Sequence, residues 1–197
     1  GLVPIVFDTS NGTVIKIVSS TDSSWYDYSN QEWANVVLVK ESGTQTRAYY
    51  KANPGVTVNE NDILAYYVWI PRYSYKIFNL GNYSSVINGT PTESMAQEIS
   101  IKFENKTEAK KTTQSVGSYY THPAFTFGDE ELNGIWVAKY ETSGSTSSLT
   151  VLPNVSSLRE INVYTMFTSS YNFDRTNDSH MMKNTEWGAV AYLSHSK

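Results

Sequence analysis

The stretch Ile63-Leu64-Ala65-Tyr66-Tyr67-Val68-Trp69-Ile70 decides the fold class, because eight apolar or aromatic residues follow one another without an interruption. A run of this length without polar alternation is typical of a central strand, or of a short segment that is buried in another way. The polar residues 59–62 precede the run and Pro71 follows it, so the segment is short. The sequence leaves the choice between these two structures open.

Two β-branched runs near the N-terminus predict a hairpin. Residues Leu2–Phe7 and Thr13–Val18 flank Asp8-Thr9-Ser10-Asn11-Gly12, whose Asn-Gly pair is a strong turn signal. Pro4 has no backbone N–H to donate to a neighbouring strand. We therefore expect the strand Leu2–Phe7 to lie at an edge of its sheet.

Further strands are predicted on both sides of the central run. Val36–Val39 is a short apolar segment typical of a buried strand, and Tyr73–Phe78 follows Pro71 as another strand. Glu98–Glu104 alternates strictly between polar and apolar residues, which is typical of a half-exposed strand. Gly134–Glu141 is rich in aromatic and apolar residues and predicts a strand as well. Residues 79–97 contain many Asn, Gly, Ser and Thr residues and predict a loop.

Two helices are predicted near the C-terminus. Ser157-Leu158-Arg159-Glu160 matches a capping box, in which the Ser hydroxyl and the Glu carboxylate each accept a hydrogen bond from a free backbone N–H. A helix over residues 158–169 should follow it. A second helix is expected over residues 185–195, with Asn184 or Thr185 as its N-cap.

The second predicted helix is apolar for most of its length, so we expect it to be well buried. Its large apolar residues, Trp187 among them, leave little polar surface. Gly188 inside this helix costs about 1 kcal/mol relative to alanine. The close approach of another backbone would explain that cost.

The order of these elements predicts an α+β fold that is rich in β-structure, with one or two helices in the second half. We expect a β-rich N-terminal region, residues 1–58, and a second region, residues 59–197, with a loop-rich insertion near residues 79–118. One continuous domain is the alternative. At 197 residues the chain buries enough surface to fold without disulfides or metals.

The composition excludes several classes of protein. The chain has 15 Lys and Arg residues against 19 Asp and Glu residues, a net charge of −4, and therefore lacks the basic excess of a nucleic-acid-binding protein. It contains no Cys, so thiol catalysis, thiolate metal sites and disulfides are all excluded. No apolar run of 18 residues is present, and no membrane span is predicted.

The unusual feature of the composition is its aromatic content, with five Trp and 15 Tyr residues. Tyr and Trp are rigid and amphipathic, and they are favoured at binding surfaces. Packing inside the domain is the alternative for each of them, and we expect it for Trp69, Trp136 and Trp187. The candidate ligand-binding residues are those expected in loops and at strand ends: Trp25, Tyr26, Tyr28, Trp33, Tyr119 and Tyr120.

Catalytic and metal-binding patterns are weak. No pair of His residues has the spacing of a helical metal site, and neither a Gly-rich phosphate loop nor a nucleophile elbow is present. Three acidic clusters could offer oxygens to a hard cation, but they are expected to form solvated turns, and no cofactor is predicted. The titratable residues in question are His122, His180, His195 and the segments 59–62, 129–131 and 174–178.

Three parts of the chain carry a resemblance to known proteins: residues 25–35 together with 68–73, residues 122–141, and residues 179–194. Together they resemble a group of surface and prophage-associated proteins of Gram-positive, clostridia-like bacteria. Within them, the strand ending in Tyr140-Glu141 and the helix start Asn184-Thr185-Glu186-Trp187 are similar to the formylglycine-generating-enzyme branch of the C-type-lectin fold. The resemblance implies a C-type-lectin-like second half.

Two departures from that branch bear on function. Its copper-dependent members hold the metal with a cysteine pair, which this chain lacks, and its iron-dependent members need a His cluster that the three His residues here do not match. The resemblance therefore implies no enzymatic activity. Such proteins usually continue past the last helix with a Gly-rich segment. The printed sequence ends at Lys197, so we expect an incomplete lectin-like domain.

We expect a non-catalytic binding or adhesion module that is exposed on a bacterial cell surface or a phage virion, with a host-surface glycan or protein as its ligand. The first alternative is a structural subunit of a fibre, pilus-like or tail assembly, in which the edge strand Leu2–Phe7 pairs with a neighbouring copy. The second alternative, an enzyme of the formylglycine-generating type, is disfavoured by the absence of Cys.

Overall fold

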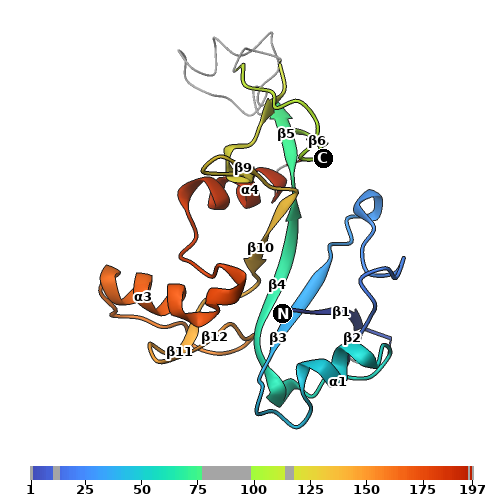
Figure 1. Cartoon of the computed structure of the whole chain (residues 1–197), viewed down its shortest axis with the longest axis vertical. Helices are drawn as coiled ribbons and strands as arrows, with labels where there is room; N and C mark the ends of the chain where they lie inside the picture. The colour runs from blue at the N-terminus through green and yellow to red at the C-terminus, as the bar shows by residue number, and fades with distance from the viewer. Residues whose placement is uncertain (1, 11–13, 77–98, 114–117, 195, 197) are drawn as a thin grey trace. The chain divides into compact units, whose positions relative to one another are not determined.

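The computed structural model describes residues 2–10, 14–76, 99–113, 118–194 and 196. It has an α+β fold, with three α-helices and several antiparallel sheets in this part of the chain (Figure 1). The chain divides into two compact units. The first consists of Gly1–Trp69 and Trp136–Met181, and the second of Ile70–Ile135 and Met182–Lys197. The boundary expected between residues 58 and 59 lies inside the first unit.

The main sheet contains the predicted central strand. Its five strands are β1 (Val3–Asp8), β2 (Val14–Ile17), β3 (Asn35–Val39), β4 (Ile63–Pro71) and β10 (Gly134–Ala138), in the order β10-β4-β3-β1-β2. Strand β4 therefore has a neighbour on each side, which confirms a central strand. The antiparallel pairing of β1 with β2 confirms the N-terminal hairpin, although the Asn-Gly part of its turn falls outside the described residues.

The edge position predicted for the first strand is wrong, because β1 lies between β2 and β3. The carbonyl of Pro4 accepts a hydrogen bond from the N–H of Val18 at 3.1 Å. A residue's N–H and C=O groups point to the same side of a strand, so the missing N–H of Pro4 faces β2 at the end of that ladder. The proline therefore interrupts no pairing with β3, and strand addition at β1 is excluded.

One face of this sheet carries the aliphatic core of the first unit. Its buried members come from β1 to β4 and from the segments that cover them: Val3, Ile5, Ile15, Ile17, Val37, Val39, Tyr50, Val58, Ile63 and Tyr66. Tyr50 belongs to α1 (Arg47–Ala52), a short helix that the sequence did not predict and that Thr46 caps by accepting from the N–H of Tyr49. The buried carboxylate of Asp62 accepts the Tyr50 hydroxyl at 3.0 Å.

A hairpin and a helix complete the first unit. Strands β11 (Ser143–Ser145) and β12 (Ser148–Thr150) form an antiparallel pair. The helix predicted over residues 158–169 is α3, and it runs instead from Val163 to Phe173. Its N-cap is Asn162, whose side chain accepts from the N–H of Thr165 at 2.9 Å. The capping box is wrong because Glu160 has a left-handed backbone with φ 58, outside any helix.

The second unit is built around three short strands and one helix. Strands β5 (Tyr73–Lys76), β6 (Ser100–Phe103) and β7 (Tyr120–Thr121) form a sheet in the order β6-β5-β7, which confirms the strands predicted at 73–78 and 98–104 within the described residues. Strands β8 (Thr126–Phe127) and β9 (Glu130–Glu131) form a hairpin. The predicted C-terminal helix is α4 (Asn184–Ser194). The predicted loop over 79–97 lies outside the described residues.

In the part of the chain that the structure describes, four single turns of 3-10 helix connect these elements. They span Tyr28–Asn30, Glu60–Asp62, Pro123–Phe125 and Arg175–Asn177. The first of them forms a tight turn, since Asp27 and Glu32 pair on either side of it.

Helix α4 packs on the core of the second unit through Ala189 and through Tyr192, whose ring centroid lies 4.9 Å from that of Tyr75. The hydroxyl of Tyr73 donates to the carbonyl of Ala189 at 2.7 Å, and both residues are fully buried. The expectation that Trp187 packs inside the domain is wrong, since its side chain is 65% exposed. The fully buried residues of the helix are Glu186 and Ala189, and residues 190–193 are half-buried.

The glycine inside α4 contacts a side chain, not a backbone. A Cβ atom on Gly188 would meet the ring of His122 at 3.6 Å from Nε2, an ordinary van der Waals distance. His122 is buried, and its Nδ1 accepts a structural hydrogen bond from the N–H of Ala124 at 3.2 Å. Burial lowers the pKa of His122 to about 4.

Replacing this glycine should stabilise the protein. Gly188→Ala adds a methyl group that fits beside His122 and removes the helix-propensity cost of glycine, so we expect the free energy of unfolding to rise by about 1 kcal/mol. Chemical denaturation measures the change. A loss of stability would contradict this account, because it would mean that the added methyl group does not fit beside the ring of His122.

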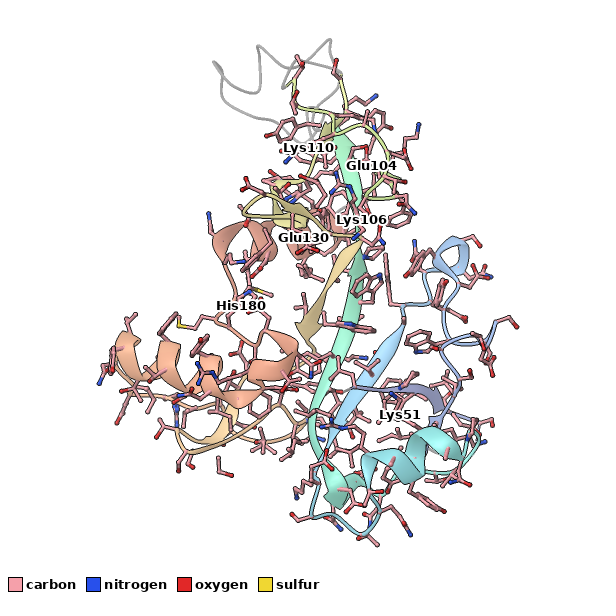
Figure 2. All side chains as sticks on the ribbon, viewed as in Figure 1. Lys51, Glu104, Lys106, Lys110, Glu130 and His180 are labelled. Carbon is pink, nitrogen blue, oxygen red and sulfur yellow. The ribbon has the colours of Figure 1, made fainter. Side chains whose placement is uncertain are left out.

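A network of charges surrounds the buried guanidinium of Arg72. Its Nη1 donates to Glu131 Oε2 at 2.6 Å and its Nε lies 3.6 Å from Glu104 Oε2. Lys110 pairs with Glu131 at 2.9 Å, and Lys111 pairs with Glu104. Figure 2 shows Glu104 and Lys110 in this part of the second unit.

Burial would raise the pKa of Glu131, but its hydrogen bonds to Lys110, Arg72 and Thr126 outweigh this effect and lower the pKa to about 2.

This lowered pKa makes the second unit sensitive to acid. The Glu131 carboxylate stabilises the folded state above its unfolded pKa of about 4.3, and that contribution disappears as the pH falls toward about 2. We expect the free energy of unfolding to decrease over this range, with uptake of about one proton at Glu131. In Glu131→Gln, denaturation curves at several pH values should show that the free energy of unfolding decreases less steeply as the pH falls. An identical slope in both proteins would contradict this account.

Candidate ligand-binding pocket

A cavity of about 430 Å³ lies in the first unit, within the range of roughly 300–1,000 Å³ that is usual for small-molecule sites. Its lining combines aromatic, aliphatic and polar side chains. They are Leu2, Pro4, Ser20, Trp25, Val36, Lys51, Tyr67, Trp136, Asp174 and Asn177.

The floor of this pocket is a row of cross-strand neighbours. Pro4 of β1 pairs with Val36 of β3, and Val36 pairs with Tyr67 of β4. Successive residues of a strand point to opposite faces, so this row lies on the face opposite to Val37 and Tyr66 of the core. The same sheet thus carries the larger aliphatic core on one face, and on the other face the pocket together with a smaller buried cluster of Leu38, Ala65 and Val151.

Two indole rings form an aromatic platform beside this floor. The ring centroids of Trp25 and Trp136 are 6.3 Å apart, and Trp136 contacts Trp69 at 5.0 Å. A ligand ring needs about 3.5–4.0 Å of contact distance on each side, so no ring fits between Trp25 and Trp136. A ligand would therefore stack on the accessible surface of the pair. The orientation of Trp25 is fixed, because its Nε1 donates to the carbonyl of Asn35 at 2.9 Å.

The polar part of the lining comes from three further segments. Asp174 and Asn177 follow α3, where the Asn177 amide donates to the Asp174 carboxylate at 2.5 Å. Lys51 belongs to α1 and reaches toward β1 (Figure 2). Burial, and next the charge of Asp174, raise the pKa of Tyr67 to about 12. The Tyr67 hydroxyl therefore stays protonated at neutral pH and keeps its hydrogen-bond donor.

The predicted aromatic residues of the N-terminal half form one continuous group. Ring centroids are 6.0 Å apart between Trp25 and Tyr26, 4.8 Å between Tyr26 and Tyr28, and 5.3 Å between Tyr28 and Trp33. Tyr26 is exposed, whereas the other three are half-buried. Burial, together with the neighbouring Tyr26, raises the pKa of Tyr28 to about 12. Of this group, only Trp25 lines the pocket.

The other two candidates, Tyr119 and Tyr120, lie in the second unit. Tyr120 packs edge to face on Tyr75 at 5.9 Å, and the ammonium of Lys76 lies 5.5 Å from the Tyr119 ring centroid. They are not part of the pocket lining.

Sequence reasoning missed most of the pocket. Trp136 was expected to pack inside the domain, yet it forms half of the platform and also contacts Trp69. Tyr67 could not be singled out, because it belongs to the uninterrupted apolar run of β4, which gives no sign of which residues face the pocket. Asp174 and Asn177 belong to a segment expected to be a solvated turn. Their position follows from where α3 ends, which no local pattern in the sequence indicates.

The remaining titratable clusters have structural partners. Asp62 accepts the backbone N–H groups of Thr44 and Gln45 at 2.6 and 3.1 Å, and Glu131 pairs with Arg72. His180 bonds the Asp178 carbonyl through Nδ1 at 2.7 Å, and His195 is not among the described residues. In the described part of the chain, no three His, Asp or Glu residues are grouped so that they could hold a metal ion.

No protein-family model, curated protein or solved structure shows significant similarity to this chain. Of the helices in the described segments, none is both long and apolar enough to cross a membrane.

The hydrogen bond of Trp25 to β3 can be tested on its own. Trp25→Phe keeps an aromatic ring but removes the donor to the Asn35 carbonyl, so we expect a loss of about 1 kcal/mol in the free energy of unfolding. Trp187→Phe is the matched control because Trp187 is exposed, and it should change stability by less than about 0.5 kcal/mol. Equal effects of the two substitutions in chemical denaturation would show that this bond does not hold Trp25 in place.

Proposed function

We propose that this chain is a non-catalytic binding module whose first unit takes a sugar ring of a surface glycan. The observation that carries the proposal is the lining of the pocket, in which the Trp25 and Trp136 rings adjoin the polar side chains of Asp174 and Asn177. Sugar rings offer an apolar C–H face and a rim of hydroxyl groups. An indole surface matches the first, and carboxylate and amide groups match the second.

The two aromatic rings are favourable for binding because they are held in place before a ligand arrives. Trp25 is fixed by its bond to Asn35, and Trp136 by β10 and by its contact with Trp69. A rigid ring loses little conformational entropy on binding, which raises affinity for a given contact area. A flexible aliphatic lining would not give this advantage.

The exposed ring of Tyr26 extends this aromatic surface beyond the pocket. It stacks on Tyr28, which in turn contacts Trp33. A glycan longer than one residue would find further rings to stack on, so we propose that Tyr26, Tyr28 and Trp33 support an extended ligand. A module of this kind belongs on a cell surface or a virion, and the resemblance of residues 134–141 and 184–187 to the lectin-type branch is in keeping with that location.

The test is a titration of the purified chain with a panel of methyl glycosides of neutral, N-acetylated and acidic hexoses, followed by Trp fluorescence and by calorimetry. We expect at least one of these glycosides to bind, and Trp25→Ala to weaken its binding by about tenfold through loss of the stacking contact. Asp174→Asn keeps the shape of the pocket and changes its polar side, so it should alter the preference among the glycosides.

Trp187→Ala is the control variant, because Trp187 is exposed and lies outside the pocket lining. It should bind as the unchanged chain does. If no glycoside of the panel binds, the proposed ligand class is wrong. If Trp25→Ala and Trp187→Ala weaken binding equally while both remain folded, the binding site lies elsewhere.

A further inference from the structure

The pocket of the first unit carries one charged side chain of each sign. Asp174 follows α3 and Lys51 lies in α1, and both belong to the lining. Among the described residues, neither of them takes part in an ion pair, with the other or with any further group. Both charges therefore remain available to a ligand.

Asp174 lies at the β4 end of the pocket floor. Phe173, which precedes it, packs on the same small buried cluster as Tyr67 of β4. The charge of Asp174 also acts on the Tyr67 hydroxyl, whose pKa it raises further after the larger effect of burial. The carbonyl of Asp174 accepts the backbone N–H groups of Asn177 and Ser179 at 3.1 Å each, so its position is fixed.

The carboxylate of Asp174 keeps one oxygen atom for a ligand. The side-chain amide of Asn177 donates to Oδ2, and within the described segments Oδ1 receives no hydrogen bond. Asp174 is half-buried, so a cation that binds to Oδ1 would be partly shielded from water. A hydrogen bond to a charged group is stronger than one between neutral groups, most of all where water is excluded.

Lys51 lies at the opposite, β1 end of the floor. Helix α1 packs against β1, and Figure 2 shows Lys51 beside this strand. The floor runs from Pro4 of β1 through Val36 of β3 to Tyr67 of β4. Two strand spacings, about 10 Å, separate the two ends of this row. The pocket thus has a negative end and a positive end, with room for a sugar ring between them.

The aromatic rings favour a cation at the negative end. Tyr67 lies beside Asp174, and Trp136 belongs to β10, the strand next to β4. The face of an indole or phenol ring attracts a cation, because the face carries the negative part of the ring quadrupole. An ammonium group at this end therefore meets a carboxylate and aromatic rings, both of which stabilise a positive charge.

A ligand with charges of both signs matches this lining best. A neutral sugar would cover Asp174 and Lys51 without pairing either charge, and removing an unpaired charge from water is unfavourable. A ligand with only a negative charge would be repelled by Asp174 and by the net charge of −4 of the chain. A ligand with only a positive charge would leave Lys51 unpaired.

We infer that the pocket selects a zwitterionic amino sugar, whose ammonium group pairs with Asp174 and whose anionic group pairs with Lys51. This inference rests on the proposed function, because it names the class of sugar that the same pocket takes. A hexosamine with a phosphate at C6 has the required arrangement. Its amine is on C2 and its C6 is on C5, and these two ring carbons are opposite each other across the sugar ring.

Calorimetric titration with four related sugars tests the inference: glucose, glucosamine, glucose 6-phosphate and glucosamine 6-phosphate. At pH 6 the amine is protonated and the phosphate carries at least one negative charge. We expect glucosamine 6-phosphate to bind more than about tenfold more tightly than glucose. Asp174→Asn should remove the gain due to the amine, about tenfold. Lys51→Gln should remove the gain due to the phosphate, roughly threefold because Lys51 is exposed.

Two control variants make the same changes of charge outside the lining. Asp178→Asn and Lys106→Gln replace exposed residues, and both should bind as the unchanged chain does. Circular dichroism checks that every variant is folded.

The outcomes separate this inference from the proposed function. If glucose or a neutral glycoside binds but the amine and the phosphate give no gain, the inference is wrong and the pocket remains a glycan site. The inference is also wrong if the gains persist in folded Asp174→Asn and Lys51→Gln. If no sugar of either set binds, the proposed function is wrong and the inference fails with it.

Discussion

The antiparallel pairing of β1, β3 and β4 is the constraint on which the rest of the first unit depends. Because side chains alternate along a strand, one register places Val3, Val37 and Tyr66 in the core and Pro4, Val36 and Tyr67 under the pocket. A shift of one residue would exchange the two sets and move the core side chains to the pocket face. The burial of the aliphatic face therefore also determines the composition of the pocket floor.

The segment after β12 contributes to the pocket through the end of α3. The C-terminal residue of α3, Phe173, packs against the same sheet face that carries the pocket, and Asp174 follows it directly into the lining.

Much of the fold could be predicted from local patterns, and its exceptions have physical causes. The β-branched, apolar and alternating runs identified the strands β1, β2, β3, β5, β6 and β10, because side-chain period and propensity favour strands there. Pro4 led to the wrong prediction that β1 is an edge strand. Its missing backbone N–H lies where the pairing of β1 with β2 ends, so it interrupts no hydrogen bond within the sheet. The start of α3 was predicted too early in the chain, because Ser157 and Asn162 both have side chains that can cap a helix. The left-handed backbone of Glu160 excludes a helix that begins after Ser157, so Asn162 is the N-cap.

The candidate site was less predictable than the fold. Trp25 could be identified because an aromatic residue in a polar, turn-rich segment has no local reason to be buried. Two other Trp residues show why the rest of the site could not be predicted. Trp136 belongs to a strand and Trp187 to an apolar helix, and both were expected to pack inside the domain. Trp136 instead lines the pocket, and Trp187 is exposed. Their exposure depends on which elements cover them, and that is decided by contacts between segments far apart in the chain.

The central claim is that the sheet face opposite to the aliphatic core binds the ligand through Trp25 and Trp136. Fluorine NMR of the chain labelled with fluorotryptophan tests it most directly, because each of the five Trp residues then gives its own resonance. On addition of a glycoside that binds, the account predicts that the resonances of Trp25 and Trp136 shift while that of the exposed Trp187 stays in place. Shifts confined to Trp187, or no shift at Trp25 and Trp136 at a saturating glycoside concentration, would contradict it.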